Sequence, residues 1–153
     1  MKAHLAQINL SQGGVPKRAV QTARIAFLGL EGDQQAHDQV HGGPERAVCL
    51  YSLERILALQ AEGHPVFPGA LGENLTLWGL DWSPVTPGVR LHIGDQVTLE
   101  VTRYTTPCKT IQAYFREQHI LRIHQEQFPG WSRVYARVLT PGEVCAGMPV
   151  SME

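Results

Sequence analysis

The residue best suited to chemistry is Cys108, which lies between Pro107 and Lys109 in the stretch YTTPCKTI. Pro107 forces Thr106 into an extended conformation and so fixes the direction in which the chain reaches the cysteine. The charge of Lys109 and the N-terminus of a following helix would both stabilise a thiolate, so we expect the pKa of Cys108 to fall below about 8.5. A thiolate can attack an electrophile, carry a persulfide or bind a soft metal. Position alone leaves open a half-buried structural cysteine.

Other reactive side chains are less informative. A cysteine hydrolase needs a histidine base, and the sequence does not choose among His41, His92, His119 and His124. The loop segment HDQVH, residues 37–41, resembles half of a zinc site, but no second ligand pair is clustered, so we predict no zinc there. Cys49 and Cys145 lie in apolar strand patterns and are expected to pack in the core.

Two glycine-rich loops have the composition of ligand-binding segments. Glycine lacks a Cβ, so HGGP (His41–Pro44) and LGENL (Leu71–Leu75) allow a ligand to approach the backbone closely. Cations near loops and strand ends could hold a phosphate, or could be ordinary surface charges. These cations are Lys17, Arg18, Arg46, Arg103, Lys109, Arg133 and Arg137.

The elements that must position these residues are mostly strands. Alternating or short apolar segments predict strands at residues 3–11, 18–27, 47–51, 90–93, 97–103, 132–139 and 148–152, with a further strand beginning at Leu75. Helices are predicted from the N-cap Ser52 to Gly63, after Cys108, and at residues 120–128. In the first helix, Leu53, Ile56, Leu57 and Leu59 are expected to face inward. Residues 29–46 read as a long loop. This pattern favours a mainly β (α+β) domain, a β-barrel with two or three peripheral helices.

Composition narrows the class of protein. The 153 residues fit one domain, 1–153, and can bury a sizeable core. Thirteen Lys and Arg against 14 Asp and Glu give no electrostatic argument for nucleic acid or a membrane surface. Three cysteines suit a reducing cytosol, and neither a signal peptide nor a spanning helix is predicted. We therefore expect a cytoplasmic protein.

Several fragments, taken in order, resemble the MOSC family, which is named for the C-terminal domain of molybdenum cofactor sulfurases. They extend over about residues 13–151. The fragments are GLEGD from Gly29, HGGPERAVCLY from His41, GALGENL from Gly69, IGD from Ile93, the Pro107–Cys108 pair and RVYARVLTPGEVCAG from Arg133.

The resemblance implies a MOSC-type β-barrel in which Cys108 is the molybdenum ligand or a sulfur carrier. It also implies binding of the molybdenum cofactor (molybdopterin), with no iron–sulfur cluster or haem. The signature loops place His41, Gly42, Gly43, Glu73 and Asn74 at the cofactor, and Lys17 matches a basic position near the pterin phosphate. We add Arg103, Thr106 and Lys109, which flank the Pro–Cys pair, to this cofactor-binding set.

Three functions are compatible with the resemblance. The first is an oxidoreductase that reduces N-hydroxylated small molecules and takes electrons from a separate donor protein. The second is a sulfur carrier whose Cys108 persulfide is loaded by a separate cysteine desulfurase. The third is a cofactor-binding module without turnover. One departure bears on the first, because relatives of that kind often carry arginine two residues before the Pro–Cys pair, where this chain has Thr105.

Overall fold

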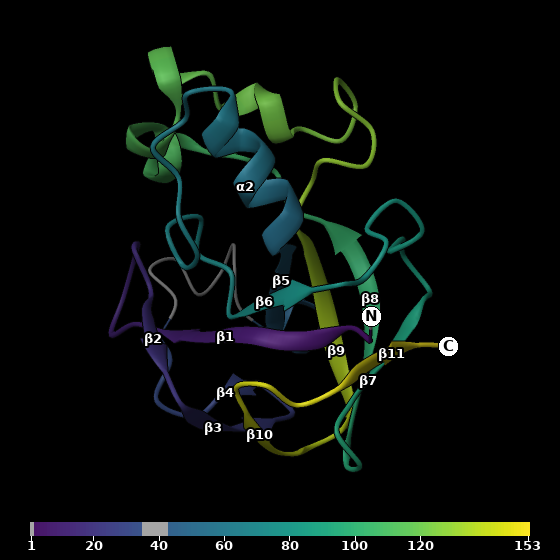
Figure 1. Cartoon of the computed structure of the whole chain (residues 1–153). Helices are drawn as coiled ribbons and strands as arrows, with labels where there is room; N and C mark the ends of the chain where they lie inside the picture. Colours follow the sequence, from purple (N-terminus) through teal and green to yellow (C-terminus); the bar gives the residue numbers. More distant parts are fainter. Residues whose placement is uncertain (1, 35–42) are drawn as a thin grey trace.

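The computed structural model describes residues 2–34 and 43–153, and its regular structure is mostly strand (Figure 1). The strands are β1 His4–Leu10, β2 Arg18–Val20, β3 Thr22–Ala26, β4 Gly29–Leu30, β5 Val48–Ser52, β6 Leu75–Trp78, β7 Arg90–Ile93, β8 Val97–Tyr104, β9 Val134–Thr140, β10 Gly142–Cys145 and β11 Val150–Met152. The helices are α2 Leu53–Ala61 and four 3-10 helices, η1 Pro44–Arg46, η2 Lys109–Tyr114, η3 Arg116–Gln118 and η4 Ile120–Ile123.

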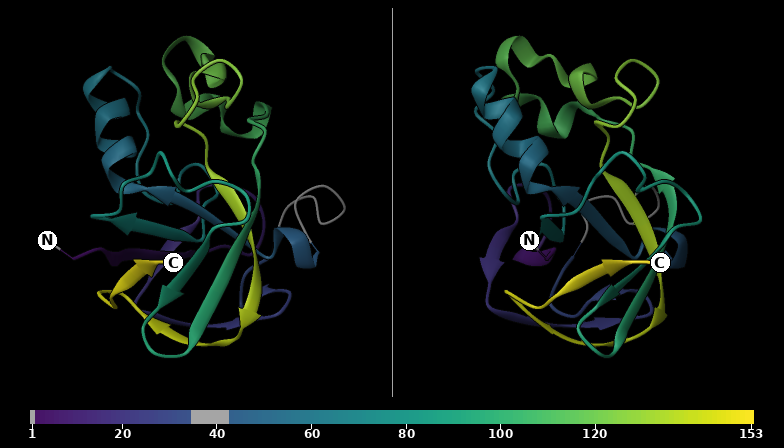
Figure 2. Two further views of the ribbon diagram at one scale, coloured as in Figure 1. Left: turned by 90° about the vertical axis from the view of Figure 1, so that its right-hand side faces the viewer. Right: turned by 45° about the vertical axis from the view of Figure 1, so that its right-hand side comes forward.

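Eight strands form one sheet in the order β11-β7-β8-β9-β5-β6-β1-β2, and β10, β3 and β4 form a second. Neighbouring strands are antiparallel except β5 and β6, which run parallel and are joined through α2, because parallel neighbours need a crossover connection. Figures 1 and 2 show α2 and η2–η4 gathered at one end of the large sheet and the three-stranded sheet at the other.

The two ends of the large sheet approach each other without forming a continuous ladder. Leu5 N–H donates to the Met148 carbonyl at 2.8 Å, and Gly147 N–H donates to the Leu5 carbonyl at 2.7 Å. A single bridge pairs His4 with Pro149. The predicted mainly β fold with few helices is therefore confirmed, whereas closure of the sheet into a barrel is not confirmed.

Helix α2 forms where the sequence predicts it. The Ser52 hydroxyl accepts a hydrogen bond from the Arg55 N–H and so caps the first turn. Ile56 and Leu59 are fully buried, but Leu57 is exposed, so the inward-facing stripe is narrower than predicted.

The remaining helix predictions need correction. The segment after Cys108 is the 3-10 helix η2, and residues 120–128 contain only the four-residue η4. The single predicted strand at residues 18–27 is split into β2 and β3. No helix within residues 2–34 and 43–153 is long and apolar enough to cross a membrane.

The hydrophobic core fixes the strands that carry the candidate site. In β8 the side chains of Val97, Leu99 and Val101 are buried on one face, as the alternation predicts. In β9 the core residues are Val134, Ala136 and Val138. The strand ends at Tyr104 and Val134, which pair with each other, are therefore rigidly placed next to the segment that holds Cys108.

Candidate functional site

Cys108 follows the end of β8 at the surface. The Thr105 N–H donates to the Arg133 carbonyl at 3.0 Å and extends the β8–β9 pairing by one step. Pro107 is buried, and Cys108 itself is partly exposed with an extended backbone (φ −136°, ψ 175°). Its Sγ lies 2.9 Å from the Thr110 hydroxyl oxygen. The thiol is thus anchored by rigid backbone and open to solvent on part of its surface.

The predicted helix N-terminus at Cys108 is much weaker than expected. Cys108 occupies the N-cap position of η2, but it makes no side-chain capping bond, and η2 has six residues. A single 3-10 segment of this length has a small dipole, because the dipole grows with the number of aligned peptide units. Any electrostatic support of the thiolate has to come from charged side chains instead.

Two cations lie beside Cys108 in the sequence and are open to solvent. Arg103 and Lys109 are exposed, as is Thr106. Within the described residues neither cation forms an ion pair. Both therefore remain available to an anionic ligand, which is the arrangement that their predicted role requires.

We call Cys108 and the exposed residues Arg103, Thr106 and Lys109 the rim of the site. A second thiol, that of Cys49, lies behind this rim. Cys49 pairs with Tyr135 across β5 and β9, and Arg103 pairs with Tyr135 across β8 and β9, so these three side chains share one face of the sheet. Burial raises the pKa of the Cys49 thiol to about 11. Burial, with a smaller contribution from Cys49, also raises the pKa of the Tyr135 phenol. Cys49 is therefore a neutral thiol at physiological pH.

The predicted core placement of the two other cysteines holds only for one of them. Cys49 is buried as expected. Cys145 on β10 is only partly buried, and its N–H lies 3.4 Å from the Met148 sulfur. All three cysteines are free thiols.

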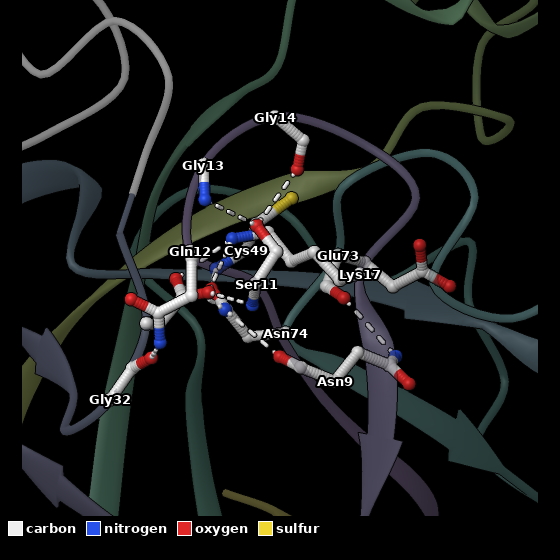
Figure 3. A network of polar contacts seen from close by, with 11 residues as sticks. Asn9, Ser11, Gln12, Gly13, Gly14, Lys17, Gly32, Cys49, Glu73 and Asn74 are labelled. Carbon is white, nitrogen blue, oxygen red and sulfur yellow. Dashed lines mark hydrogen bonds and ion pairs between the residues drawn. The ribbon is translucent and has the colours of Figure 1, made fainter.

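Next to Cys49, a polar network ties together segments that are distant in the sequence (Figure 3). The Lys17 ammonium donates to both carboxylate oxygens of Asp33, at 2.8 and 2.7 Å. The Asn74 amide donates to Asp33 at 3.0 Å, and its Oδ1 accepts the Cys49 N–H at 3.1 Å. The side chains of Lys17 and Asp33 are only 6% and 5% exposed, so this ion pair is buried. Lys17, predicted near the pterin phosphate, would have to leave Asp33 or share it in order to bind an anion.

Glu73 is the second centre of this network. Its Oε2 accepts the Gly69 N–H at 2.9 Å and the Thr76 hydroxyl at 3.0 Å, and the Asn9 amide donates to that hydroxyl at 3.1 Å. Burial raises the pKa of the Glu73 carboxyl, and the other oxygen, Oε1, is buried without a hydrogen-bond partner. Glu73 and Asn74 therefore hold their own loop in place, whatever contact they also make with a ligand.

Of the first signature loop, only its end can be placed. His41 and Gly42 lie outside the described residues, as do His37 and Asp38. Gly43 has φ 92° and ψ 169°, a conformation essentially restricted to glycine, and an added Cβ would meet nothing within 4 Å. The backbone at Gly43 is therefore open to close approach, as the prediction requires.

Sequence reasoning missed two residues that the fold brings to this site. Asp33 belongs to the GLEGD fragment, yet nothing in the sequence indicates that it pairs with Lys17, sixteen residues earlier. Tyr135 lies in a strand pattern that looks purely structural, and only the β5–β9 register shows that it faces Cys49. Within the described residues there is no group of three or more His, Cys, Asp and Glu side chains that could bind a metal together.

Comparison with known proteins identifies the family. The model of the MOSC domain matches residues 37–151. Protein YiiM of Escherichia coli (strain K12) is 36% identical over 137 residues, which cover 84% of this chain and 58% of YiiM. Its crystal structure superposes on the whole chain and on 70% of its own length with a TM-score of 0.73 and 27% identity.

Two further relatives extend the comparison. Uncharacterized protein YflK of Bacillus subtilis (strain 168) is 32% identical over 137 residues, 88% of this chain and 60% of YflK. A protein of Gibberella moniliformis (strain M3125 / FGSC 7600) named "Reductase" is 33% identical over 129 residues, 81% of this chain but 22% of the fungal protein. The chain thus spans 58% to 60% of the bacterial relatives and a fifth of the fungal one. Since the family model covers most of the sequence, this chain belongs to the MOSC domain family.

Proposed function

We propose that this MOSC domain binds the molybdenum cofactor through Cys108 and reduces N-hydroxylated small molecules. The observation that carries the proposal is the placement of Cys108, a partly exposed thiol fixed at the end of β8 between exposed cations. The name of the fungal relative, a reductase, supports redox chemistry over sulfur transfer.

The residues around Cys108 fit an anionic, sulfur-rich group. A thiolate is a soft ligand and suits a soft metal centre better than a carboxylate would. Arg103 and Lys109 supply two positive charges that no carboxylate of the described residues neutralises. Gly43 offers an unobstructed backbone. In this proposal Cys108 would hold the metal, and Gly43, Thr106 and the two cations would contact the anionic pterin part.

The chain's own contribution is binding and orientation. The Thr110 hydroxyl, 2.9 Å from the Cys108 sulfur, can donate to a thiolate and keep it directed outward. When bound, the cofactor supplies two-electron oxygen-atom chemistry. Reduction breaks the N–O bond and consumes two electrons and two protons, releasing water and the amine-type product. The electrons come from a separate electron-donor protein that carries a flavin or an iron–sulfur centre, in a reducing cytoplasm.

Metal and pterin analysis tests the proposal. The protein is expressed in a host that makes the cofactor, and molybdenum is measured by mass spectrometry in the wild type, Cys108→Ser and Cys145→Ser. We expect molybdenum and pterin in the wild type and in Cys145→Ser, the matched control on a partly exposed thiol elsewhere. Cys108→Ser should lose at least about nine-tenths of the molybdenum, since loss of even a residue that only orients a metal ligand typically lowers metal affinity 10-fold or more.

Two outcomes would contradict the proposal. Molybdenum retained in full by Cys108→Ser removes Cys108 from the role of ligand. If the wild type lacks molybdenum, but Cys108 becomes labelled on incubation with a cysteine desulfurase and radiolabelled cysteine, the sulfur-carrier function replaces the reductase. Bound pterin without turnover, tested with a competent electron-transfer chain and a panel of N-hydroxylated substrates, would leave a binding module.

A further inference from the structure

Arg133, just before β9, is a buried cation that forms no ion pair with the described part of the chain. Its residue is 7% exposed. One guanidinium nitrogen, Nη1, donates to the Leu71 carbonyl at 2.6 Å, while Nε is buried without a hydrogen-bond partner. Within the described residues no carboxylate lies within 4.0 Å of the guanidinium.

This situation is unusual for a buried charge. Removing a guanidinium from water costs several kcal/mol unless a counter-charge or a full set of acceptors replaces the water. Two other arginines are paired with carboxylates although their side chains are more exposed, at 13% and 43%. Arg122 makes two 2.8 Å bonds to Glu62, and Arg137 lies 3.2 Å from Glu100 and 3.5 Å from Glu45. Within the described residues, Arg133 therefore lacks the carboxylate counter-charge that Arg122 and Arg137 have.

The position of Arg133 links it to the candidate site. Its carbonyl accepts the Thr105 N–H, three residues before Cys108, and its guanidinium is bonded to Leu71 in the LGENL loop. Its charge acts on the Cys49 thiol and on the Tyr135 phenol and lowers the pKa of both, against the larger effect of burial. Arg133 therefore lies where the segment of Cys108 meets the second signature loop.

Glu73 is the carboxyl group that faces this region, and it does not supply the missing charge. It forms no ion pair with Arg133, and burial raises its pKa and so favours the neutral acid. Its Oε1 is one of four buried side-chain atoms without a hydrogen-bond partner in the described residues, together with Arg133 Nε, Arg122 Nη1 and Arg137 Nε. A neutral carboxyl can donate a hydrogen bond to an anion instead of repelling it.

We propose that Arg133 is the centre of a buried oxyanion-binding site beside Cys108, which takes a phosphate or carboxylate group of a bound small molecule. The planar guanidinium offers the two parallel N–H donors that such groups prefer. Two sources have this chemistry, the phosphate of the cofactor and an acidic group of the substrate. The choice between them rests on the proposed function, whereas the existence of the site does not.

The test uses the cofactor-free full chain and inorganic phosphate as the probe. Affinity is measured by isothermal titration at low ionic strength for the wild type, Arg133→Gln, Arg133→Lys and Arg137→Gln. Arg137 is the matched control, because it lies on β9 but is half exposed and already paired with carboxylates. We expect about a tenfold or larger loss of affinity in Arg133→Gln, since a hydrogen bond to a charged group is removed. Arg133→Lys should retain part of the affinity, and Arg137→Gln all of it.

Thermal unfolding separates an anion site from a structural arginine. If Arg133 binds an anion, phosphate should raise the Tm of the wild type but not that of Arg133→Gln. Without phosphate, the variant should be no less stable than the wild type. An equal loss of Tm in Arg133→Gln with and without phosphate would make Arg133 structural. Phosphate binding that is undetectable in the wild type, or unchanged in Arg133→Gln, would overturn the site.

The source of the oxyanion is distinguished on protein produced with cofactor. Loss of pterin from Arg133→Gln, measured by fluorescence after oxidation, identifies the cofactor phosphate. Retained pterin, with a KM raised for acidic but not for neutral N-hydroxylated substrates, identifies the substrate. If the wild type contains no molybdenum but binds phosphate through Arg133, the proposed function fails and the oxyanion site stands.

Discussion

Two neighbouring polar regions of the molecule differ in how completely their charged groups are paired. The network around Lys17, Asp33, Glu73 and Asn74 is buried and almost completely paired (Figure 3). The rim around Cys108 has exposed cations, and behind it lies the guanidinium of Arg133, which donates to the Leu71 carbonyl but has no carboxylate partner within the described residues. A paired network fixes one arrangement of the chain, whereas unpaired cations favour whatever anion arrives.

This difference suggests a structural role for Glu73 and Asn74 of the second signature loop. Glu73 and Asn74 are predicted at the cofactor, yet their observed bonds hold the LGENL loop, the Asp33 carboxylate and the Cys49 backbone. Residues of a signature motif can hold the backbone around a site in place without contacting the ligand through their side chains. Their contact with the cofactor stays a prediction, and mutations in the two regions can test the contrast.

The largest effect is expected from breaking the buried ion pair. Lys17→Met leaves the Asp33 carboxylate buried without its cation and should cost about 3–5 kcal/mol of unfolding free energy. The double variant Lys17→Met/Asp33→Asn should recover most of this loss, because no charge is then left unpaired. Urea denaturation of Lys17→Met, Asp33→Asn and the double variant gives the coupling energy.

An exposed pair serves as the control for that experiment. Arg24 and Glu31 lie 3.8 Å apart with side chains 48% and 63% exposed, so Arg24→Met should change stability by less than about 1 kcal/mol. If Lys17→Met were as mild as Arg24→Met, the network around Asp33 would not be locked, and Lys17 would be free to serve a phosphate.

A glycine in each region provides the next comparison. Gly69 and Gly43 both have a positive φ, 91° and 92°, so alanine at either position carries a backbone cost of about 1–3 kcal/mol. At Gly69 the new Cβ would also overlap the Lys17 carbonyl oxygen, whereas at Gly43 it would meet nothing within 4 Å. Gly69→Ala should therefore be less stable than Gly43→Ala by about a further 1–3 kcal/mol, measured by urea denaturation. Equal losses would show that the Lys17 segment moves away from Gly69 easily.

Much of the scaffold of the site follows from local patterns. The alternation in β8, the Ser52 cap and the turn glycines are local signals, and the structure confirms β8 and α2. The rest depends on contacts between distant segments. The spacing of Ile111, Tyr114 and Phe115 predicts a helix, but Phe115 adopts an extended backbone (φ −122°, ψ 136°), and the segment remains a 3-10 helix. Likewise, Arg133 is one of the seven cations that the sequence places near loops and strand ends, and only the β8–β9 pairing shows that it lies beside Thr105.

The smallest expected effect lies where the two regions meet, at the unpartnered oxygen of Glu73. Its folded-state pKa is raised by burial, so the folded protein holds this proton more tightly than the unfolded chain does. That stabilisation is complete below the unfolded pKa of about 4.3 and is lost as pH rises through the folded pKa. Glu73→Gln keeps a neutral side chain at every pH. It should therefore gain stability relative to the wild type as pH rises from about 4 to 8, measured by urea denaturation across that range.

The direction of this pH dependence decides which region Glu73 belongs to. Glu143→Gln, on the exposed face of β10, is the control for simple loss of a carboxylate. If the stability of Glu73→Gln relative to the wild type instead fell as pH rose, Glu73 would be ionised and paired in the folded protein. The cation closest to that role is Arg133, whose charge lowers the pKa of Glu73 but which forms no ion pair with it. Such a result would supply the missing counter-charge of Arg133 from within the chain. Arg133 would then belong to the paired network around Glu73, and it would not be available to an anionic ligand.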